Sequence, residues 1–252
     1  MVVRDRTRSS QRIPIASPST NGWFAHRQLT PIATVAAAPR VSLPAALLGL
    51  VVRRVTPVYV KPDTANVSAF VVVEGVSDQV AIDALAERHG VDLAAAGIRV
   101  VRLGGAHQIG SFLDQLGPRS DGPRIAGLCD ACEEPVFRRA LERAGFGFDL
   151  TRADMERLGF YVCVADLEDE LIRALGAAAV EKILRANGDL HRFRTLQQMP
   201  EWRGRATEEQ LRRFMGSGGR RKIRYARILV AALDLERVPR PLERVLAHAV
   251  EH

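Results

Sequence analysis

The sequence of 252 residues contains only three cysteines, Cys129, Cys132 and Cys163, and all three lie in or beside apolar segments. A small, odd number of cysteines in a chain of this size argues against a disulfide-dependent secreted fold and favours a reducing, cytoplasmic setting. Long apolar runs are also missing. The longest, at residues 43–52, is ended by two arginines, well short of the roughly 18 residues that a membrane span needs. The sequence therefore predicts no membrane association.

Charge is distributed unevenly along the chain. Residues 1–65 hold nine basic and two acidic residues, residues 66–191 hold 13 and 20, and residues 192–252 hold 14 and 7. An acidic centre between basic ends is typical of a protein that attracts polyanions with one surface and collects carboxylates around a cation on another. Solvated charged faces without a binding role are the simpler alternative.

Residues 1–65 mix Arg, Ser, Pro, Thr and Ala without a sustained helical or strand period. Such a segment cannot bury a core of its own, so we expect it to be disordered or loosely packed. Its Arg-rich composition is superficially like that of a transit peptide, but no amphipathic stretch supports that assignment. A native start further downstream is the other alternative.

From residue 69 onward, short apolar runs alternate with helical patterns. Strands are expected at residues 70–73, 98–103, 125–129 and 160–164, and helices at 78–89, 109–116, 135–144 and 167–175. Strands that alternate with helices at this spacing predict right-handed crossovers. We therefore expect an α/β fold with a parallel sheet of about four strands and helices on both faces.

After residue 176 the strand pattern stops. Helical patterns cover residues 180–186, 207–215, 222–233 and 241–250, and residues 207–210 have the sequence of a capping box. The expected organisation is an α/β domain at 66–190 and a basic helical extension at 191–252. Residues 203–205 and 216–222 are expected to be mobile basic loops between these helices.

Three of the four predicted strands end in a carboxylate: Glu74, Asp130 and Asp166. Asp78 and Glu168 follow closely, in first turns of helices where the dipole favours an ionised group. Ligands of open parallel sheets bind beyond the carboxyl ends of the strands. Five carboxylates at one edge would repel each other without a divalent cation, and oxygen ligands favour Mg²⁺ or Mn²⁺ over zinc. Taken singly, the helix-start acids also suit a purely structural role.

These residues fall within recognisable motifs. Residues 73–78 (VEGVSD) resemble the first motif of the Toprim domain, and residues 128–133 (LCDACE) resemble its second, an Asp-x-Asp motif. Asp166-Leu167-Glu168 after the fourth strand and Lys222 near the start of a late helix complete the set. Together they resemble the Toprim half of the OLD (overcoming lysogenisation defect) family endonucleases, over residues 70 to about 233.

This resemblance implies a DNA endonuclease that uses one or two Mg²⁺ or Mn²⁺ ions. It implies that Glu74, Asp78 and Asp130 bind metal and that Asp166 and Glu168 complete a second metal position. Lys222 would then balance charge in the transition state, and Glu74 would also act as general acid or base. Arginines expected to hold the nucleic-acid backbone are Arg212, Arg213, Arg220, Arg221 and Arg224; a solvated helix face is the alternative for each.

The sequence departs from the family pattern at two points. Cys132 stands where the second Asp of Asp-x-Asp belongs, and a thiolate is a poor ligand for Mg²⁺; Glu133 is the candidate replacement. OLD proteins couple Toprim to an ATPase, but no phosphate-binding P-loop motif occurs here, so an ATPase would be a separate partner. A second copy of the chain is a further expected partner.

Two other activities stay open. The first is a non-catalytic Toprim module that binds nucleic acid or regulates another protein, and the second, less favoured, is a nucleotidyl transferase. The Cys129-x-x-Cys132 spacing lacks the second pair that a zinc site requires. Phe193 and Trp202 lie among arginines, but two aromatic residues are too few for a base-stacking platform.

Overall fold

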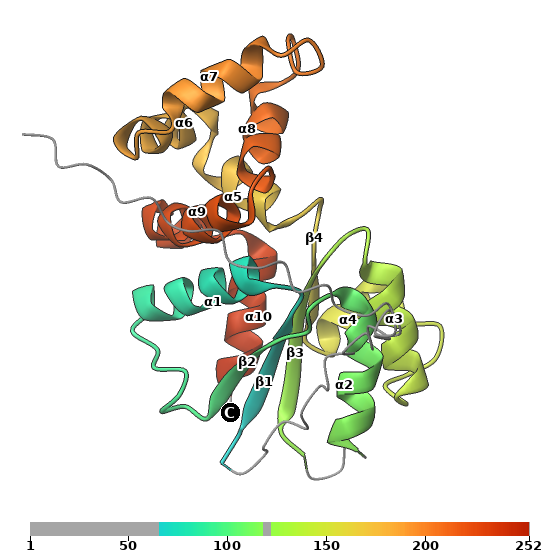
Figure 1. The fold of residues 1–252 in the computed structure, drawn as a ribbon. Coiled ribbons are helices and arrows are strands. Elements are labelled where there is room, and N and C mark those ends of the chain that lie inside the picture. The colour runs from blue at the N-terminus through green and yellow to red at the C-terminus, as the bar shows by residue number, and fades with distance from the viewer. Residues whose placement is uncertain (1–65, 118–121, 252) are drawn as a thin grey trace, which may run out of the picture. The chain divides into compact units, whose positions relative to one another are not determined.

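The structure is a computed structural model that describes residues 66–117 and 122–251, all within one unit of the chain, Pro57–His252. The predicted N-terminal segment 1–65 lies outside the described residues. Four parallel strands form the central sheet: β1 (Ala69–Val73), β2 (Ile98–Arg102), β3 (Arg124–Asp130) and β4 (Phe160–Cys163). Their order across the sheet is β2-β1-β3-β4 (Figure 1). The predicted parallel α/β fold is confirmed.

Strand β1 shows why these segments become strands. All five of its residues, AFVVV, are fully buried. β-branched and aromatic side chains suit a pleated strand, and a continuous apolar run suits a parallel sheet whose two faces are both covered. β1 therefore occupies the interior of the sheet, between β2 and β3.

One face of the sheet is covered by α1 (Val76–Arg88) and α10 (Arg240–Val250), and α9 (Gly219–Ala232) packs along α1 (Figure 1). Their apolar side chains join Val71 and Val73 in a first core cluster. Because this cluster also contains residues of the C-terminal helices, the predicted boundary at 190/191 divides residues that share one core.

The opposite face is covered by α2 (Ile109–Leu116), α3 (Glu134–Arg143) and α4 (Arg152–Arg157). A short turn, η2 (Ala106–Gln108), directly precedes α2. The side chains of these helices form a second core cluster with alternate residues of the strands. Phe70 of β1 meets Phe112 of α2 edge to face, with ring centroids 5.6 Å apart. Helices thus cover both faces, as predicted.

The remaining helices lie beyond the carboxyl ends of the strands: α5 (Leu167–Leu175), α6 (Ala177–Ala186), α7 (Leu190–Gln198) and α8 (Thr207–Gly216) (Figure 1). They pack on one another and on α9. A buried hydrogen bond from the Tyr225 hydroxyl to Asp189, 2.9 Å long, ties α9 to the start of α7. A short turn, η4 (Leu235–Arg237), then leads into α10.

Helices α1 and α9 are tied together at their C-terminal ends. One guanidinium nitrogen of Arg88 donates to the carbonyl oxygens of Val230 at 2.9 Å and Leu233 at 2.6 Å. The Val230 carbonyl also accepts the Leu233 N–H at 3.2 Å, so the arginine adds a second donor to it and a donor to the Leu233 carbonyl, at the end of α9.

Several local predictions are wrong. The capping box at 207–210 does not form, because Thr207 is the first residue of α8 and not the capping residue before it. Ala206 precedes the helix, its carbonyl accepts the Gln210 N–H at 3.1 Å, and no side chain caps the helix. Residues 219–222 form the first turn of α9 rather than a loop. Helices α4 and α7 were not predicted, since both are short and carry weak apolar patterns.

No helix in the part of the chain that the structure describes is long and apolar enough to span a membrane.

The close approach of β3 to its neighbours depends on Gly127. A Cβ atom there would lie 2.5 Å from the Phe160 ring and 3.0 Å from a methyl group of Val72. We expect Gly127→Ala to lower the free energy of unfolding by about 1–3 kcal/mol through overpacking, as measured by chemical denaturation. The control Gly219→Ala, where no atom lies within 4 Å, should cost nothing; equal effects of the two changes would contradict this packing.

Candidate functional site

The carboxyl ends of β1 and β3 lie side by side, because the two strands pair in parallel with Val72 opposite Gly127. Strand order reverses between them: the chain moves from β1 outward to β2, then returns to β3 on the other side of β1. Such a switch point is where open α/β sheets bind ligands. Glu74 follows β1, and Asp130 is the last residue of β3.

Glu74 and Asp130 are in direct contact. The Glu74 Oε1 atom accepts the backbone N–H of Asp130 at 3.1 Å. This bond orients the Glu74 carboxylate across the gap between the two strands, so the predicted neighbourhood of these two residues is present in the structure.

Asp78 reaches the same edge from the first turn of α1. Its Oδ2 atom accepts the backbone N–H of Gly75 at 2.9 Å, and its Oδ1 atom accepts the Ser77 hydroxyl at 3.4 Å. Gly75 adopts an extended conformation between strand and helix. Asp78 therefore closes the turn that connects β1 to α1 and has a structural role there as well as any chemical one.

Asp166 and Glu168 lie at the start of α5, and each is paired with a cation. Asp166 caps α5 by accepting the Asp169 N–H at 2.8 Å, while its other oxygen accepts from Arg212 Nε at 2.6 Å. Glu168 is buried, with Oε2 3.0 Å from Lys222 Nζ. The C-terminal helices α8 and α9 thus supply positive charge to this end of the sheet.

The carboxylates strongly affect one another's protonation. Burial, together with the charges of Glu74, Asp78 and Asp166, raises the pKa of Asp130 to about 8 against the opposing effect of Lys222. Burial likewise raises the pKa of Glu74 and of Asp78 above their ordinary values. These couplings show that the side chains lie near one another and that local cations do not fully balance their charge.

Lys222 is half-buried within this acidic group. Burial lowers its pKa, but Glu168, Asp78 and Asp130 raise it by more, so the pKa lies above its ordinary value. The ammonium group therefore stays charged over the physiological range.

The donor set fits a hard divalent cation. Glu74, Asp78 and Asp130 offer only oxygen atoms, and a bound cation would relieve their mutual repulsion. Within residues 66–117 and 122–251, no three Asp, Glu, His or Cys side chains are placed so that they could hold a metal ion as they stand. Each of the three carboxylates would have to turn toward an ion that it shares with the others.

The cysteines differ in exposure. Cys129 and Cys163 are buried, which raises the pKa of both thiols. Cys132 is exposed beside the rim that Glu74, Asp78 and Asp130 form at the carboxyl ends of the strands. Burial and the charges of Glu133 and Asp130 also raise the pKa of Cys132. A protonated thiol supplies neither the charge nor the hard donor of the aspartate expected at this position.

The predicted backbone-binding arginines have different environments. Arg221 donates to the Phe214 carbonyl at 2.8 Å and lies over its ring, and Arg224 pairs with Asp189 at 3.3 Å. Both therefore brace the helical part of the protein. Arg220, in the first turn of α9, is exposed.

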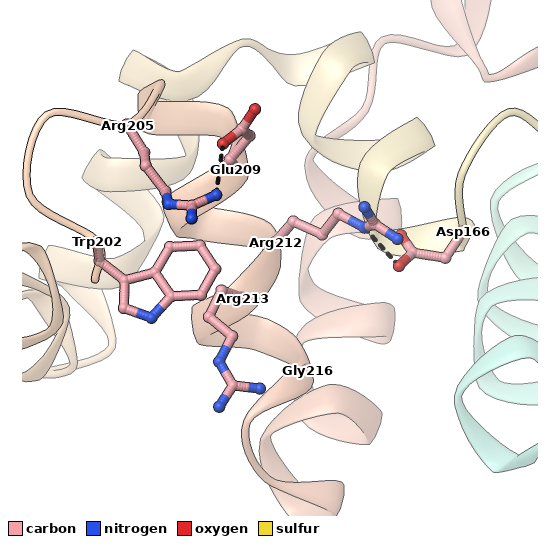
Figure 2. Close-up of a pocket in the computed structure, with 7 residues that line it drawn as sticks. All are labelled: Asp166, Trp202, Arg205, Glu209, Arg212, Arg213 and Gly216. Carbon is pink, nitrogen blue, oxygen red and sulfur yellow. Dashed lines mark hydrogen bonds and ion pairs between the residues drawn. The ribbon is translucent and has the colours of Figure 1, made fainter.

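A pocket beside Asp166 was missed by sequence reasoning. Figure 2 shows Trp202 with Arg205 on one side and Arg213 on the other, while Arg212 reaches Asp166. From the sequence, Trp202 and Phe193 are too few aromatic residues for a base-stacking platform, and Arg205 falls in a predicted mobile loop. Their proximity to the rim results from the packing of α8 against α5, for which the local sequence carries no signal.

The comparisons with known proteins agree with this architecture. Residues 67–118 match the family model of the overcoming lysogenization defect protein-like TOPRIM domain. The C-terminal region of the Burkholderia pseudomallei OLD protein is 19% identical, with 73% of this chain and 97% of that chain covered and a TM-score of 0.56. The C-terminal region of the Xanthomonas campestris pv. campestris OLD protein is 22% identical, with 73% of this chain and 92% of that chain covered and a TM-score of 0.58. A comparison with curated proteins gives no significant match.

The raised pKa of Asp130, about 8 against an ordinary 3.8, makes stability depend on pH. Between these values the folded protein holds a proton that the unfolded chain has released, so the free energy of unfolding falls as pH rises. In EDTA, we expect the midpoint of thermal unfolding to fall by about 2 °C or more from pH 6 to pH 8.5.

The fall should be smaller in Asp130→Asn, and Mn²⁺ should reduce it in the wild-type protein. Asp114→Asn is the control, because Asp114 is exposed on α2, and it should keep the wild-type dependence. An identical pH dependence of wild type and Asp130→Asn would contradict the electrostatic coupling at the rim.

Proposed function

We propose that this chain, whose residues 67–118 match the OLD-like TOPRIM family model, is a metal-dependent endonuclease that cleaves DNA at the rim of Glu74, Asp78 and Asp130. The observation that supports this most is the convergence of these carboxylates, from β1, α1 and β3, at the switch point of the sheet. A structural role explains Asp78 alone. It does not explain a partly buried Glu74 bound to the end of the neighbouring strand.

In this proposal, Glu74, Asp78 and Asp130 would hold Mg²⁺ or Mn²⁺. When bound, the ion polarises the scissile phosphate and lowers the pKa of the attacking water. The Asp130 N–H holds Glu74 in place through Oε1. Burial raises the pKa of Glu74, which makes its carboxylate a better acceptor for the proton that the water loses, and this fits Glu74 as the general base.

Lys222 has a separate role. Its charged ammonium group lies 3.0 Å from Glu168 and is near enough to Asp78 and Asp130 to raise the pKa of Lys222. A fixed positive charge beside the rim would stabilise negative charge that develops on the phosphate oxygens in the transition state.

The pairing of Asp166 with Arg212 and of Glu168 with Lys222 bears on the number of ions. A second ion at Asp166 and Glu168 would have to compete with both cations, while Glu74, Asp78 and Asp130 are short of positive charge. The proposal is therefore a site with one ion bound by those three residues and with Arg212 and Lys222 supplying charge at the second position.

One observation favours a second candidate function. The exposed Cys132 lacks the charge of the motif's second aspartate, which weakens the rim as a metal site. A Toprim module that binds nucleic acid without cleaving it is the corresponding alternative. The separate ATPase and a second copy of the chain stay predictions from the sequence.

Cleavage is tested with supercoiled plasmid and Mn²⁺. We expect the wild type to nick the plasmid and Glu74→Gln to reduce the rate by about 100-fold or more, since general-base contributions are typically 10²–10⁴-fold. Glu181→Gln is the matched control, because Glu181 lies on α6 and pairs with Arg194 at the surface; its rate should equal that of the wild type. Equal nicking by Glu74→Gln would reject the catalytic assignment, and plasmid binding without nicking would favour the non-catalytic module.

The number of ions is measured by calorimetric titration with Mn²⁺. We expect one ion per chain in the wild type and loss of binding in Asp130→Asn, whose neutral amide cannot replace the carboxylate. Arg212→Ala frees Asp166 and should allow a second ion to bind. Two ions in the wild type would show that the arginine does not occupy the second position.

A further inference from the structure

The pocket at Trp202 has the composition of a nucleotide-binding site. Its lining residues are Asp166, Trp202, Arg205, Glu209, Arg212, Arg213 and Gly216, around a cavity of about 430 Å³ (Figure 2). Small-molecule sites typically enclose ~300–1,000 Å³, so the cavity is large enough for a single nucleotide. It is not an apolar core defect, because charged side chains make up most of its wall.

Residue Trp202 is held in place through its backbone. Its backbone N–H donates to the Met199 carbonyl at 2.9 Å, and its own carbonyl accepts from Gln210 Nε2 at 2.7 Å. Gln210 is itself buried and accepts from Gln197 at 2.6 Å. The ring packs against the first core cluster while remaining partly exposed, so one part of it is anchored and another faces the pocket.

Two guanidinium groups flank this ring. The central carbon of Arg205 lies 5.0 Å from the centroid of the Trp202 ring, and that of Arg213 lies 5.9 Å from it. Arg205 also meets Glu209 at 3.8 Å, but both side chains are more than half exposed, so this pair contributes little. Arg213 is paired with no carboxylate in the described part of the chain. Arg205 Nε also donates to the Glu201 carbonyl at 2.8 Å, so Arg205 would offer a phosphate its terminal N–H groups, while Arg213 can turn toward a phosphate at little cost.

The pocket also adjoins the proposed catalytic rim. Asp166 lines the pocket, and Arg212 on its wall donates to this same aspartate. A polyanion bound beside Arg205 and Arg213 would therefore lie next to Arg212, the residue that links the pocket to Asp166.

From this arrangement we infer that the pocket binds one nucleotide of an unpaired strand, with the base stacked on Trp202 and the phosphate held by Arg205 and Arg213. Bases inside a duplex expose no face to an aromatic ring, whereas bases of a single strand do. This inference rests on the proposed nuclease function and specifies its substrate: nucleic acid with a single-stranded segment, such as a flap, gap or frayed end.

Binding is measured in EDTA, so that cleavage does not interfere. The full chain with Trp23→Phe leaves Trp202 as the sole tryptophan, and its fluorescence is followed during titration with oligothymidylate of 12 nucleotides, with a blunt duplex of the same length, and with thymidine monophosphate. We expect quenching by the oligonucleotide at concentrations at least tenfold lower than by the duplex or the mononucleotide.

Variants are compared by the anisotropy of a labelled oligonucleotide. Trp202→Leu should weaken binding by about 5- to 100-fold, the range of one stacked base, while Trp202→Phe should retain most of the affinity. Arg213→Gln should weaken binding and reduce the slope of log affinity against log salt by about 0.7, the value for one phosphate contact to a single strand. The control Arg203→Gln, in the same segment but outside the pocket, should bind as the wild type does.

Equal affinity for duplex and single strand, unchanged binding in Arg213→Gln, or a mononucleotide that binds as tightly as the oligonucleotide would each overturn the inference. Arg213 is exposed, so its variant still tests the pocket if Trp202→Leu fails to fold. The outcome is separable from the proposed function: Trp202-dependent binding without plasmid nicking supports the pocket and rejects the nuclease, while nicking by a Trp202→Leu variant with unchanged affinity rejects only the pocket.

Discussion

The parallel pairing of β1 with β3 determines the rest of the site. It places the ends of two strands that are more than 50 residues apart in sequence beside each other, and the hydrogen bond from the Asp130 backbone N–H then holds the Glu74 carboxylate at the end of β3. Burying acidic groups together raises the free energy of the folded chain, since each must lose water near a like charge. The fully buried β1 strand and the packed helices on both faces of the sheet offset that cost.

The C-terminal helices contribute charge as well as core. Lys222 of α9 and Arg212 of α8 reach Glu168 and Asp166 from outside the sheet, so these cations come from a later part of the chain than the carboxylates with which they pair. The segregation of charge seen in the sequence thus has a structural counterpart: the basic part folds against the acidic part and neutralises some of it. A part of the rim, at Glu74, Asp78 and Asp130, is left with excess negative charge.

The sequence predicts the sheet because its signals are local. Runs such as Phe70–Val73 and the turns that follow them depend on neighbouring residues, and the order of the motifs identifies the fold. The same is true of the carboxylates, whose place at strand ends puts them at one edge of any parallel sheet. The sequence cannot predict the Arg212–Asp166 pair or the pocket at Trp202, because both arise from the packing of α8 on α5. Helices α4 and α7 were missed for a different reason: short helices are decided by tertiary contacts rather than by propensity.

The hydrogen bonds of Arg88 restrict how the two helices beside the site can move. Helix α1 carries Asp78 in its first turn and α9 carries Lys222 in its first turn, and the two helices run in the same direction with their C-terminal ends joined through Arg88 to Val230 and Leu233. Neither helix can slide along the other without breaking those hydrogen bonds. The hydrogen bonds of Arg88, at the end of the helix pair away from the rim, thus help to set the distance between the Lys222 ammonium group and the acidic residues, and loosening them would shift that positive charge without changing any residue beside it.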